Sequence, residues 1–343
     1  MGGFRVYATM DQRMKLSEVA AHARRAEAMG YDGLNVPDSV HDGLLVAGAA
    51  LQATQTLRVA TSVLVAFPRS PMTVAVAAWD LQEVSGGRFE LGIGSQVRGN
   101  IVGRYSTPWS APVPRMREYI QSLRAIFACW QHGEKLAFEG EYYVFTKMQP
   151  FFKPDPLERP DIPIYMGGIG PMMVALAGEV SDGLMLHPTN TAPRYLREVV
   201  IPRLERGAGR GGRAGEALPL MVGPFSITGP DDEELAAQRE HTRQLLTFLY
   251  STPSYWPSLE LFGWRERGEK LHELTRAGDW AAMEGIVDDE MLATFAPVGS
   301  YATIAETIRE WYGELTDWIT FPMPADPEND AAVARVIADL RAR

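Results

Sequence analysis

Cysteine is almost absent from this 343-residue sequence, and its single thiol, Cys129, has no partner for an internal disulfide. Such cysteine usage is typical of a reducing compartment, so we expect a cytoplasmic protein. The apolar neighbours Ile126, Phe127 and Trp130 place this thiol on a helix face, which favours burial over a catalytic role. Clusters of histidine and cysteine with the spacing of a zinc site are also missing, and we expect no metal.

Positive charge is in short supply as well, because 33 Lys and Arg stand against 43 Asp and Glu, for a net charge of −10. Phosphate backbones are bound by basic surfaces, so this balance argues against a nucleic-acid partner. The Arg- and Gly-rich residues 206–215 are accordingly interpreted as a solvated loop. No apolar run is long enough to span a bilayer, and the first residues do not resemble a secretory signal, so we expect no membrane partner.

The sequence instead contains a regular alternation of strand-like and helix-like segments. This pattern predicts a parallel sheet covered by helices, and eight repeats predict a closed α/β fold, the (β/α)8 or TIM barrel. The eight expected strands are residues 4–9, 33–36, 58–67, 88–94, 162–167, 182–186, 218–227 and 318–322. We expect a single domain over residues 1–343, with a β excursion at 136–145 and a helical insertion at 251–290 before the last strand.

Two of the six histidines follow expected strands, and active sites of such barrels lie at the carboxyl ends of the strands. His41 comes after the second strand with Asp38 and Asp42 beside it; acidic neighbours would hold a proton on the ring and make it a proton donor. His187 follows the sixth strand and is either a site residue or a hydrogen-bonded structural histidine. The others lie in helical segments and are interpreted as surface or packing residues: His22, His132, His241 and His272.

Glycines also gather at strand ends. Residues 167–170, Gly-Gly-Ile-Gly, lie between a strand and a helix, where backbone N–H groups can face an anion at the helix N-terminus. The pair Gly92 and Gly94 either serves a ligand in the same way or relieves crowding inside the barrel. Neither segment has the spacing or the following acidic residue of a Rossmann dinucleotide site.

Several segments carry a family resemblance. LQEVSGGRFELGIGSQ at residues 81–96 resembles the luciferase-like monooxygenase superfamily, and further similar segments extend over nearly the whole chain. These are AEAMGYDGL (26–34), TSVLVAFPRSP (61–71), PWSAPVPRMREYI (108–120), PIYMGGIGPMM (163–173) and AGEVSDGLMLHP (177–188). The last four are most similar to the branch of F420-dependent oxidoreductases.

The resemblance implies a homodimeric barrel that binds the deazaflavin F420, or alternatively FMN, at the carboxyl ends of its strands. It also implies a cis peptide between Ser62 and Val63 beneath the cofactor ring, and a phosphate cradle at residues 167–169. Together with the strand-end residues Asp38 and His187, the candidate cofactor contacts are Ser62, Val63, Gly94, Ser95, Gln96, Asn100, Gly167, Gly168 and Ile169.

The sequence departs from this branch after the second strand. Many F420 enzymes carry Asp-His there, whereas this chain has Asp38-Ser39, and His41 follows two positions later. Either His41 reaches the same space from a longer loop, or no histidine has that role. We retain Asp38 and His41 as candidate catalytic residues.

The sequence favours an F420-dependent oxidoreductase that transfers a hydride between the deazaflavin and a small organic or peptide substrate. The alternatives are an FMN-dependent monooxygenase and a non-catalytic flavin-binding paralogue. The expected insertion is rich in aromatic residues, and we predict that Tyr255, Trp256 and Trp264 form an apolar wall of the substrate pocket. A plain helical core is the other interpretation of the same residues.

Overall fold

A computed structural model describes residues 3–342 and confirms the closed barrel. All barrel strands are parallel, and the pairings of β13 with β1 and of β3 with β5 complete the ring. The strands are β1 (Arg5–Thr9), β2 (Gly33–Val36), β3 (Arg58–Thr61), β5 (Phe89–Gly94), β8 (Ile164–Gly167), β9 (Gly183–Met185), β10 (Leu220–Val222) and β13 (Trp318–Thr320). The short β4 (Leu64–Val65) continues β3 and also pairs with β5.

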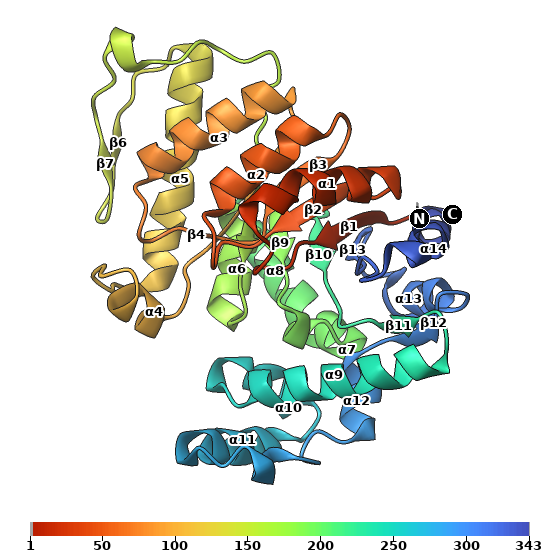
Figure 1. Ribbon diagram of the computed structural model, residues 1–343. Helices are drawn as coiled ribbons and strands as arrows, with labels where there is room; N and C mark the ends of the chain where they lie inside the picture. The colour runs from red at the N-terminus through yellow and green to blue at the C-terminus, as the bar shows by residue number, and fades with distance from the viewer. Residues whose placement is uncertain (1–2, 343) are drawn as a thin grey trace.

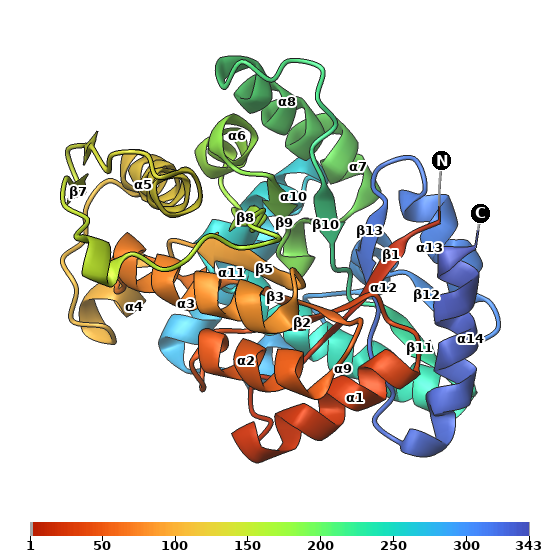
Figure 2. The same cartoon turned by 90° about the horizontal axis from the view of Figure 1, so that it is seen from above.

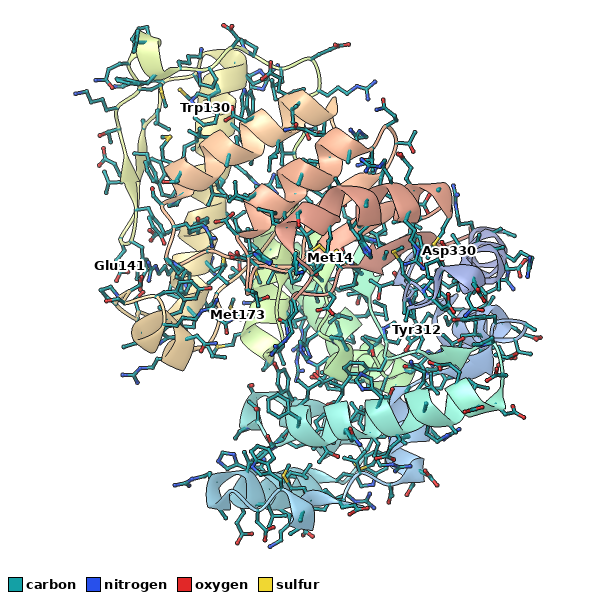
Figure 3. The ribbon with its side chains drawn as sticks, viewed as in Figure 1. Met14, Trp130, Glu141, Met173, Tyr312 and Asp330 are labelled. Carbon is teal, nitrogen blue, oxygen red and sulfur yellow. The ribbon has the colours of Figure 1, made fainter. Side chains whose placement is uncertain are left out.

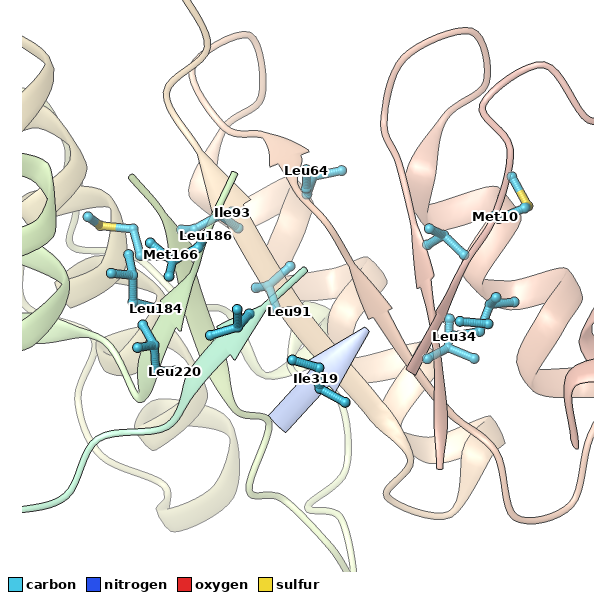
Figure 4. Close-up of a cluster of buried hydrophobic side chains, with 14 of the residues drawn as sticks. Met10, Leu34, Leu64, Leu91, Ile93, Met166, Leu184, Leu186, Leu220 and Ile319 are labelled. Atoms are coloured by element: carbon cyan, nitrogen blue, oxygen red, sulfur yellow. The ribbon is translucent and has the colours of Figure 1, made fainter. Parts of the chain in front are cut away.

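Helices cover the outside of the ring (Figures 1 and 2). The outward side chains of the strands, Leu34, Leu91 and Ile319 among them, are fully buried beneath these helices (Figure 4). The helices are α1 (Val19–Ala28), α2 (Gly43–Ala53), α3 (Pro71–Ser85), α5 (Pro112–His132), α6 (Pro171–Val180), α8 (Ile201–Arg210), α13 (Ile304–Tyr312) and α14 (Asp330–Arg341). Within residues 3–342, no helix has both the length and the apolar character needed to cross a membrane.

A helical segment leaves the barrel between β11 (Ile227–Gly229) and β12 (Val298–Ser300). These two short strands pair in parallel as a separate sheet, so the two ends of the segment lie side by side. Its helices lie beyond one end of the barrel (Figure 1). They are α9 (Asp232–Tyr250), α10 (Trp256–Leu261), α11 (Arg265–Ala277) and α12 (Asp289–Phe295).

Two expectations about local structure were wrong. The seventh strand does not run through residues 218–227, because β10 ends at Val222 and Ile227 already belongs to β11. Pro224 lies between them and has no N–H to donate to a strand ladder.

The second wrong expectation concerns residues 206–210, which are the last part of α8 instead of a loop. Gly207 lets α8 approach α6, since a Cβ there would lie 1.8 Å from the Ala175 carbonyl oxygen.

The barrel interior is filled and not a channel. Trp318 contacts Tyr7 and Tyr165 edge-on, with ring centroids 4.9 and 4.8 Å apart. Near the amino ends of the strands, the fully buried Glu90 carboxylate accepts hydrogen bonds from the Tyr7 hydroxyl and from Arg58, each at 3.0 Å. The interior is therefore closed on that side, and a ligand can enter only at the carboxyl ends.

Candidate active site

Eight residues, each at or just past the carboxyl end of one strand, are placed by alternation at the barrel opening. Residues two apart on a strand point to the same side, so the inward-facing Tyr7, Tyr165 and Trp318 fix which strand-end positions point inward. The next inward positions define what we call the mouth floor: Thr9, Asn35, Ser62, Gly94, Gly167, His187, Gly223 and Thr320. Apart from His187 and Asn35 these side chains are very small, which leaves the floor nearly flat.

Val63 lies across this floor. A Cβ added at Gly94 would lie 2.7 Å from one Val63 methyl carbon, and a Cβ added at Gly167 would lie 3.0 Å from the other. The two glycines therefore make room for Val63, whose peptide bond to Ser62 is cis, as predicted. A single aliphatic side chain in a flat surround is a suitable support for the face of a planar ring system.

Asn35 gives the mouth floor an unused polar atom. The side chain is 1% exposed, and its Nδ2 donates only to the sulfur of Met221, at 3.3 Å. Its Oδ1 is buried with no hydrogen-bond partner among residues 3–342. Buried polar groups are normally paired, so this amide has hydrogen-bonding capacity that a ligand on the floor can use.

Asp38 is saturated by the protein itself. Its Oδ2 accepts from Arg69 Nη1 at 2.7 Å and from the Val65 N–H at 2.9 Å, and its Oδ1 accepts from the Gly43 N–H at 3.0 Å. The carboxylate is 4% exposed. These bonds connect the end of β2 to β4 and to the start of α2, which gives Asp38 a positioning role. Its catalytic and cofactor-binding roles stay predictions.

Asp42 serves the same arginine. Its carboxylate is 2.8 Å from Arg69 Nη2 and caps α2 by accepting from the Leu44 and Leu45 N–H groups. Burial raises the pKa of Asp42, but the bonds from Arg69 and Leu45 outweigh it and leave the pKa below its usual value. Both carboxylates are thus paired with Arg69, and the role of the half-buried His41 as proton donor stays a prediction.

After β5, the candidate residues Ser95, Gln96 and Asn100 form one exposed turn beside the floor. Gln96 has a left-handed φ of 57°, rare for a side chain of this kind. Its Oε1 accepts from the Val97 N–H at 2.8 Å and from Asn100 Nδ2 at 3.2 Å. The structure thus brings these residues together at the rim, where their remaining polar atoms are accessible.

The turn after β8, residues 167–170, is the predicted anion cradle. β8 ends at Gly167 and the ten-residue α6 starts at Pro171, so Gly168, Ile169 and Gly170 connect them directly. The first N–H groups of a helix have no intrahelical partner and carry the positive end of its dipole. A Cβ at Gly170 would meet nothing within 4 Å. The cradle is therefore open and adjoins the mouth floor at Gly167, and phosphate binding in it stays a prediction.

His187 was interpreted from the sequence as either a site residue or a hydrogen-bonded structural histidine, and its contacts are compatible with both. Its Nδ1 lies 2.9 Å from the Thr189 hydroxyl, and its ring stacks on Tyr255 with centroids 4.5 Å apart. Burial lowers the pKa of His187 to about 4, so the ring is neutral at neutral pH. It is thus a structural histidine held at the edge of the floor, where it can form a hydrogen bond without bringing a charge.

A cavity of ≈ 580 Å³ opens beside the floor at Thr9, Gly223 and Thr320. We call it the side cavity. Helices α1 and α9 add to its lining the partly buried His22 and the exposed His241, both interpreted from the sequence as surface or packing residues. Two polar atoms of the lining, His22 Nε2 and Ser226 Oγ, are buried and have no partner among residues 3–342. Its apolar walls are Met14, Phe225, Leu245, Phe321 and Met323.

The side cavity offers little positive charge. Arg25 reaches its lining, but its guanidinium is held by Asp330 at 2.6 Å and by the Pro324 carbonyl at 2.8 Å (Figure 3 labels Asp330). Burial and the nearby Arg25 lower the pKa of His22, which keeps that imidazole neutral. Since the lining also holds the acidic Asp11, the cavity does not suit an anion and suits an organic molecule with one or two polar groups.

Comparison with known proteins identifies the family, since the model of the luciferase-like monooxygenase family matches residues 3–317. The chain belongs to this family. An uncharacterised protein of Mycobacterium tuberculosis (strain ATCC 25618 / H37Rv) is 43% identical over 86% of both chains. The 5,10-methylenetetrahydromethanopterin reductase of Archaeoglobus fulgidus is 28% identical over 93% of both. The structure of the coenzyme F420-dependent tetrahydromethanopterin reductase from Methanopyrus kandleri has a TM-score of 0.75 at 21% identity, covering 99% of this chain and 98% of that one.

Trp256 and Trp264 of this luciferase-like protein lie inside the helical segment instead of at the mouth. Trp256 Nε1 donates to the Tyr250 carbonyl at 2.8 Å, and the indole packs on α11, where Gly268 makes room for it. Trp264 stacks on Phe262 and meets Phe295 of α12. Among the three aromatic residues predicted as a pocket wall, these contacts bring only Tyr255 to the floor, through His187.

We expect Trp256→Ala and Trp264→Ala each to lower the free energy of unfolding by about 2–3 kcal/mol, because each leaves a cavity in a packed aromatic cluster. Cofactor affinity should be unchanged in both variants. Chemical denaturation measures the first quantity and a cofactor titration the second. Trp280→Ala is the control, since Trp280 is 57% exposed and its loss should cost little. A loss of cofactor affinity without loss of stability would return these tryptophans to the site.

Proposed function

We propose that this protein is an F420-dependent oxidoreductase acting on a small, uncharged organic substrate. The observation that carries the proposal is the mouth floor, in which Val63 lies between Gly94 and Gly167 and adjoins the anion cradle of residues 167–170. A planar ring on the floor and its phosphate in the cradle account for both features together. When bound, the deazaflavin supplies a carbon that donates or accepts a hydride. The reductases among the relatives support this cofactor class.

Different side chains of the site would hold the cofactor and the substrate. Val63 would support the ring, and the Asn35 Oδ1, which has no partner of its own, would be available to accept a hydrogen bond from it. The side cavity opens beside the floor at Thr9 and Thr320, and the substrate would bind there, beside His22 and its apolar neighbours. Apolar walls exclude water and hold the reacting carbon close to the ring, which is where the rate advantage arises.

Proton transfer is assigned to His41, which follows the strand that carries Asn35. His187 is unsuited to this step, because burial lowers its pKa to about 4. At neutral pH the ring is therefore a neutral imidazole and cannot act as an imidazolium acid. It instead orients substrate or ring by a hydrogen bond.

An FMN-dependent monooxygenase is the second candidate, and the family to which the chain belongs favours it. The cradle accepts the phosphate of either cofactor. FMN reacts with oxygen when reduced, whereas the deazaflavin is specialised for hydride transfer, so cofactor identity decides between the two reactions.

A direct titration separates these candidates. We expect F420 to bind about tenfold or more tightly than FMN, equivalent to about 1.4 kcal/mol. The quenching of cofactor fluorescence on addition of the purified protein gives both dissociation constants. Tighter binding of FMN, together with oxygen consumption by the reduced complex, would overturn the F420 assignment in favour of the monooxygenase.

A further inference from the structure

A groove on the outside of the barrel carries four arginines. It lies over α6, between α5 and α8, with a volume of ≈ 230 Å³, and Figure 2 shows these three helices side by side. We call it the arginine groove and define it by Arg117 of α5 with Arg203, Arg206 and Arg210 of α8. The one acidic residue in its lining is Glu179 of α6.

The groove is positive in a chain whose net charge is −10. Arg117 binds the Glu179 carboxylate through two hydrogen bonds, of 2.8 and 3.0 Å, so these two charges neutralise each other. Arg203, Arg206 and Arg210 take part in none of the ion pairs found among residues 3–342. Their spacing of three and four residues places them on one face of α8. Arg206 Nε donates to the Pro202 carbonyl at 3.1 Å, and the three guanidinium groups keep their charge and further N–H donors for an anion.

The arginine face is held firmly against α6. A Cβ at Gly178 would lie 2.0 Å from the Leu204 carbonyl oxygen, and one at Gly207 would lie 1.8 Å from that of Ala175. Only glycine permits this separation of the two helices. The arginine face therefore has a fixed position relative to α6 and to the cradle that precedes it.

One end of the groove adjoins the proposed phosphate site. Pro171 and Met172, the first residues of α6, line the groove and follow directly on the cradle of residues 167–170. A ligand that has its phosphate in the cradle and continues beyond it passes over Pro171 into the groove. FMN ends at its phosphate, whereas F420 continues from its phosphate into a chain of glutamates.

We propose that the arginine groove binds the oligoglutamate tail of F420. This inference rests on the proposed function and adds a second site of recognition to it. Guanidinium groups bind carboxylates by charge-assisted hydrogen bonds in a fixed planar geometry, and three on one helix face match a chain of repeated carboxylates. The ring and phosphate are thus recognised inside the mouth, and the tail along the outer surface.

The test compares F420 that carries several glutamates with F420 from which the glutamates have been removed. Fluorescence titration at low salt should give about tenfold tighter binding of the long-tailed form, an advantage that added salt reduces. The double variant Arg206→Ala/Arg210→Ala should lose this advantage and bind the tail-less form as the wild type does. Arg276→Ala, an exposed arginine on α11, is the control and should keep the advantage.

The outcomes separate this inference from the proposed function. If neither form of F420 binds, both are overturned. If both forms bind with equal affinity, or if the groove variant weakens the two forms equally, the tail does not lie in the groove, while the F420 assignment stands. Thermal unfolding of the variants checks that they are folded, and Arg206→Glu, which reverses one charge, should penalise the long-tailed form more than the alanine variant does.

Discussion

Val63→Phe is expected to weaken F420 binding about 100-fold or more, equivalent to about 2.7 kcal/mol. The larger side chain has little room beside the floor, because even a Cβ added at Gly94 or Gly167 would lie 2.7 or 3.0 Å from a Val63 methyl carbon. It therefore rises from the mouth floor into the space assigned to the ring. The dissociation constant from a fluorescence titration, measured beside the thermal stability of the cofactor-free protein, checks this result.

Val76→Phe is the matched control, since Val76 lies on α3 and is 47% exposed. That variant makes the same chemical change away from the floor and should bind cofactor normally. Wild-type affinity in Val63→Phe would show that the ring does not lie on Val63 and would remove the main support for the proposed site.

Arg69→Met is expected to lower the free energy of unfolding by about 3–5 kcal/mol, the cost of leaving a buried carboxylate without its cation. Asp38 is 4% exposed and would keep only the Val65 and Gly43 N–H groups as partners. The loop after β2 would loosen with it, and His41 lies in that loop. Urea denaturation of the cofactor-free protein gives the change in stability.

Removing the charge should restore part of this loss, so Asp38→Asn in the Arg69→Met background is expected to be more stable than Arg69→Met alone. Asp42→Asn should cost less than Arg69→Met, because the Asp42 side chain is 40% exposed and solvent replaces its partner. A cost below about 1 kcal/mol for Arg69→Met would contradict the structural role given to this cluster.

The alternation of strands and helices could be predicted from the sequence because each element shows its own periodicity. The β3–β4 region is apolar on both faces, as a strand buried inside a barrel must be, and the cis peptide at Ser62–Val63 followed from the resemblance. The inward positions Thr9 and Asn35 were missed. Counting by two along each strand from Tyr7 and Gly33 would have found them.

Other parts of the site depend on contacts between distant segments, which periodicity does not reveal. Nothing in the residues around Asp38 indicates that Arg69, 31 positions later, takes its carboxylate. His22 and His241 were assigned to helices correctly, but the path of α9 past the strand ends, which brings His241 to the cavity, is a tertiary feature. Trp256 and Trp264 were predicted at the pocket but pack within the helical segment, because aromatic richness alone does not distinguish a pocket wall from a small core.

The parallel pairing of β11 with β12 has an evolutionary consequence. Ile227 lies beside Val298 and Gly229 beside Ser300, so the segment between them starts and finishes at one point on the scaffold. Such a segment can be lengthened, shortened or exchanged between relatives as a cassette, without altering the register of any barrel strand. The residues that this segment adds to the side cavity, His241 and Leu245 of α9, can therefore change without disturbing the strand ends.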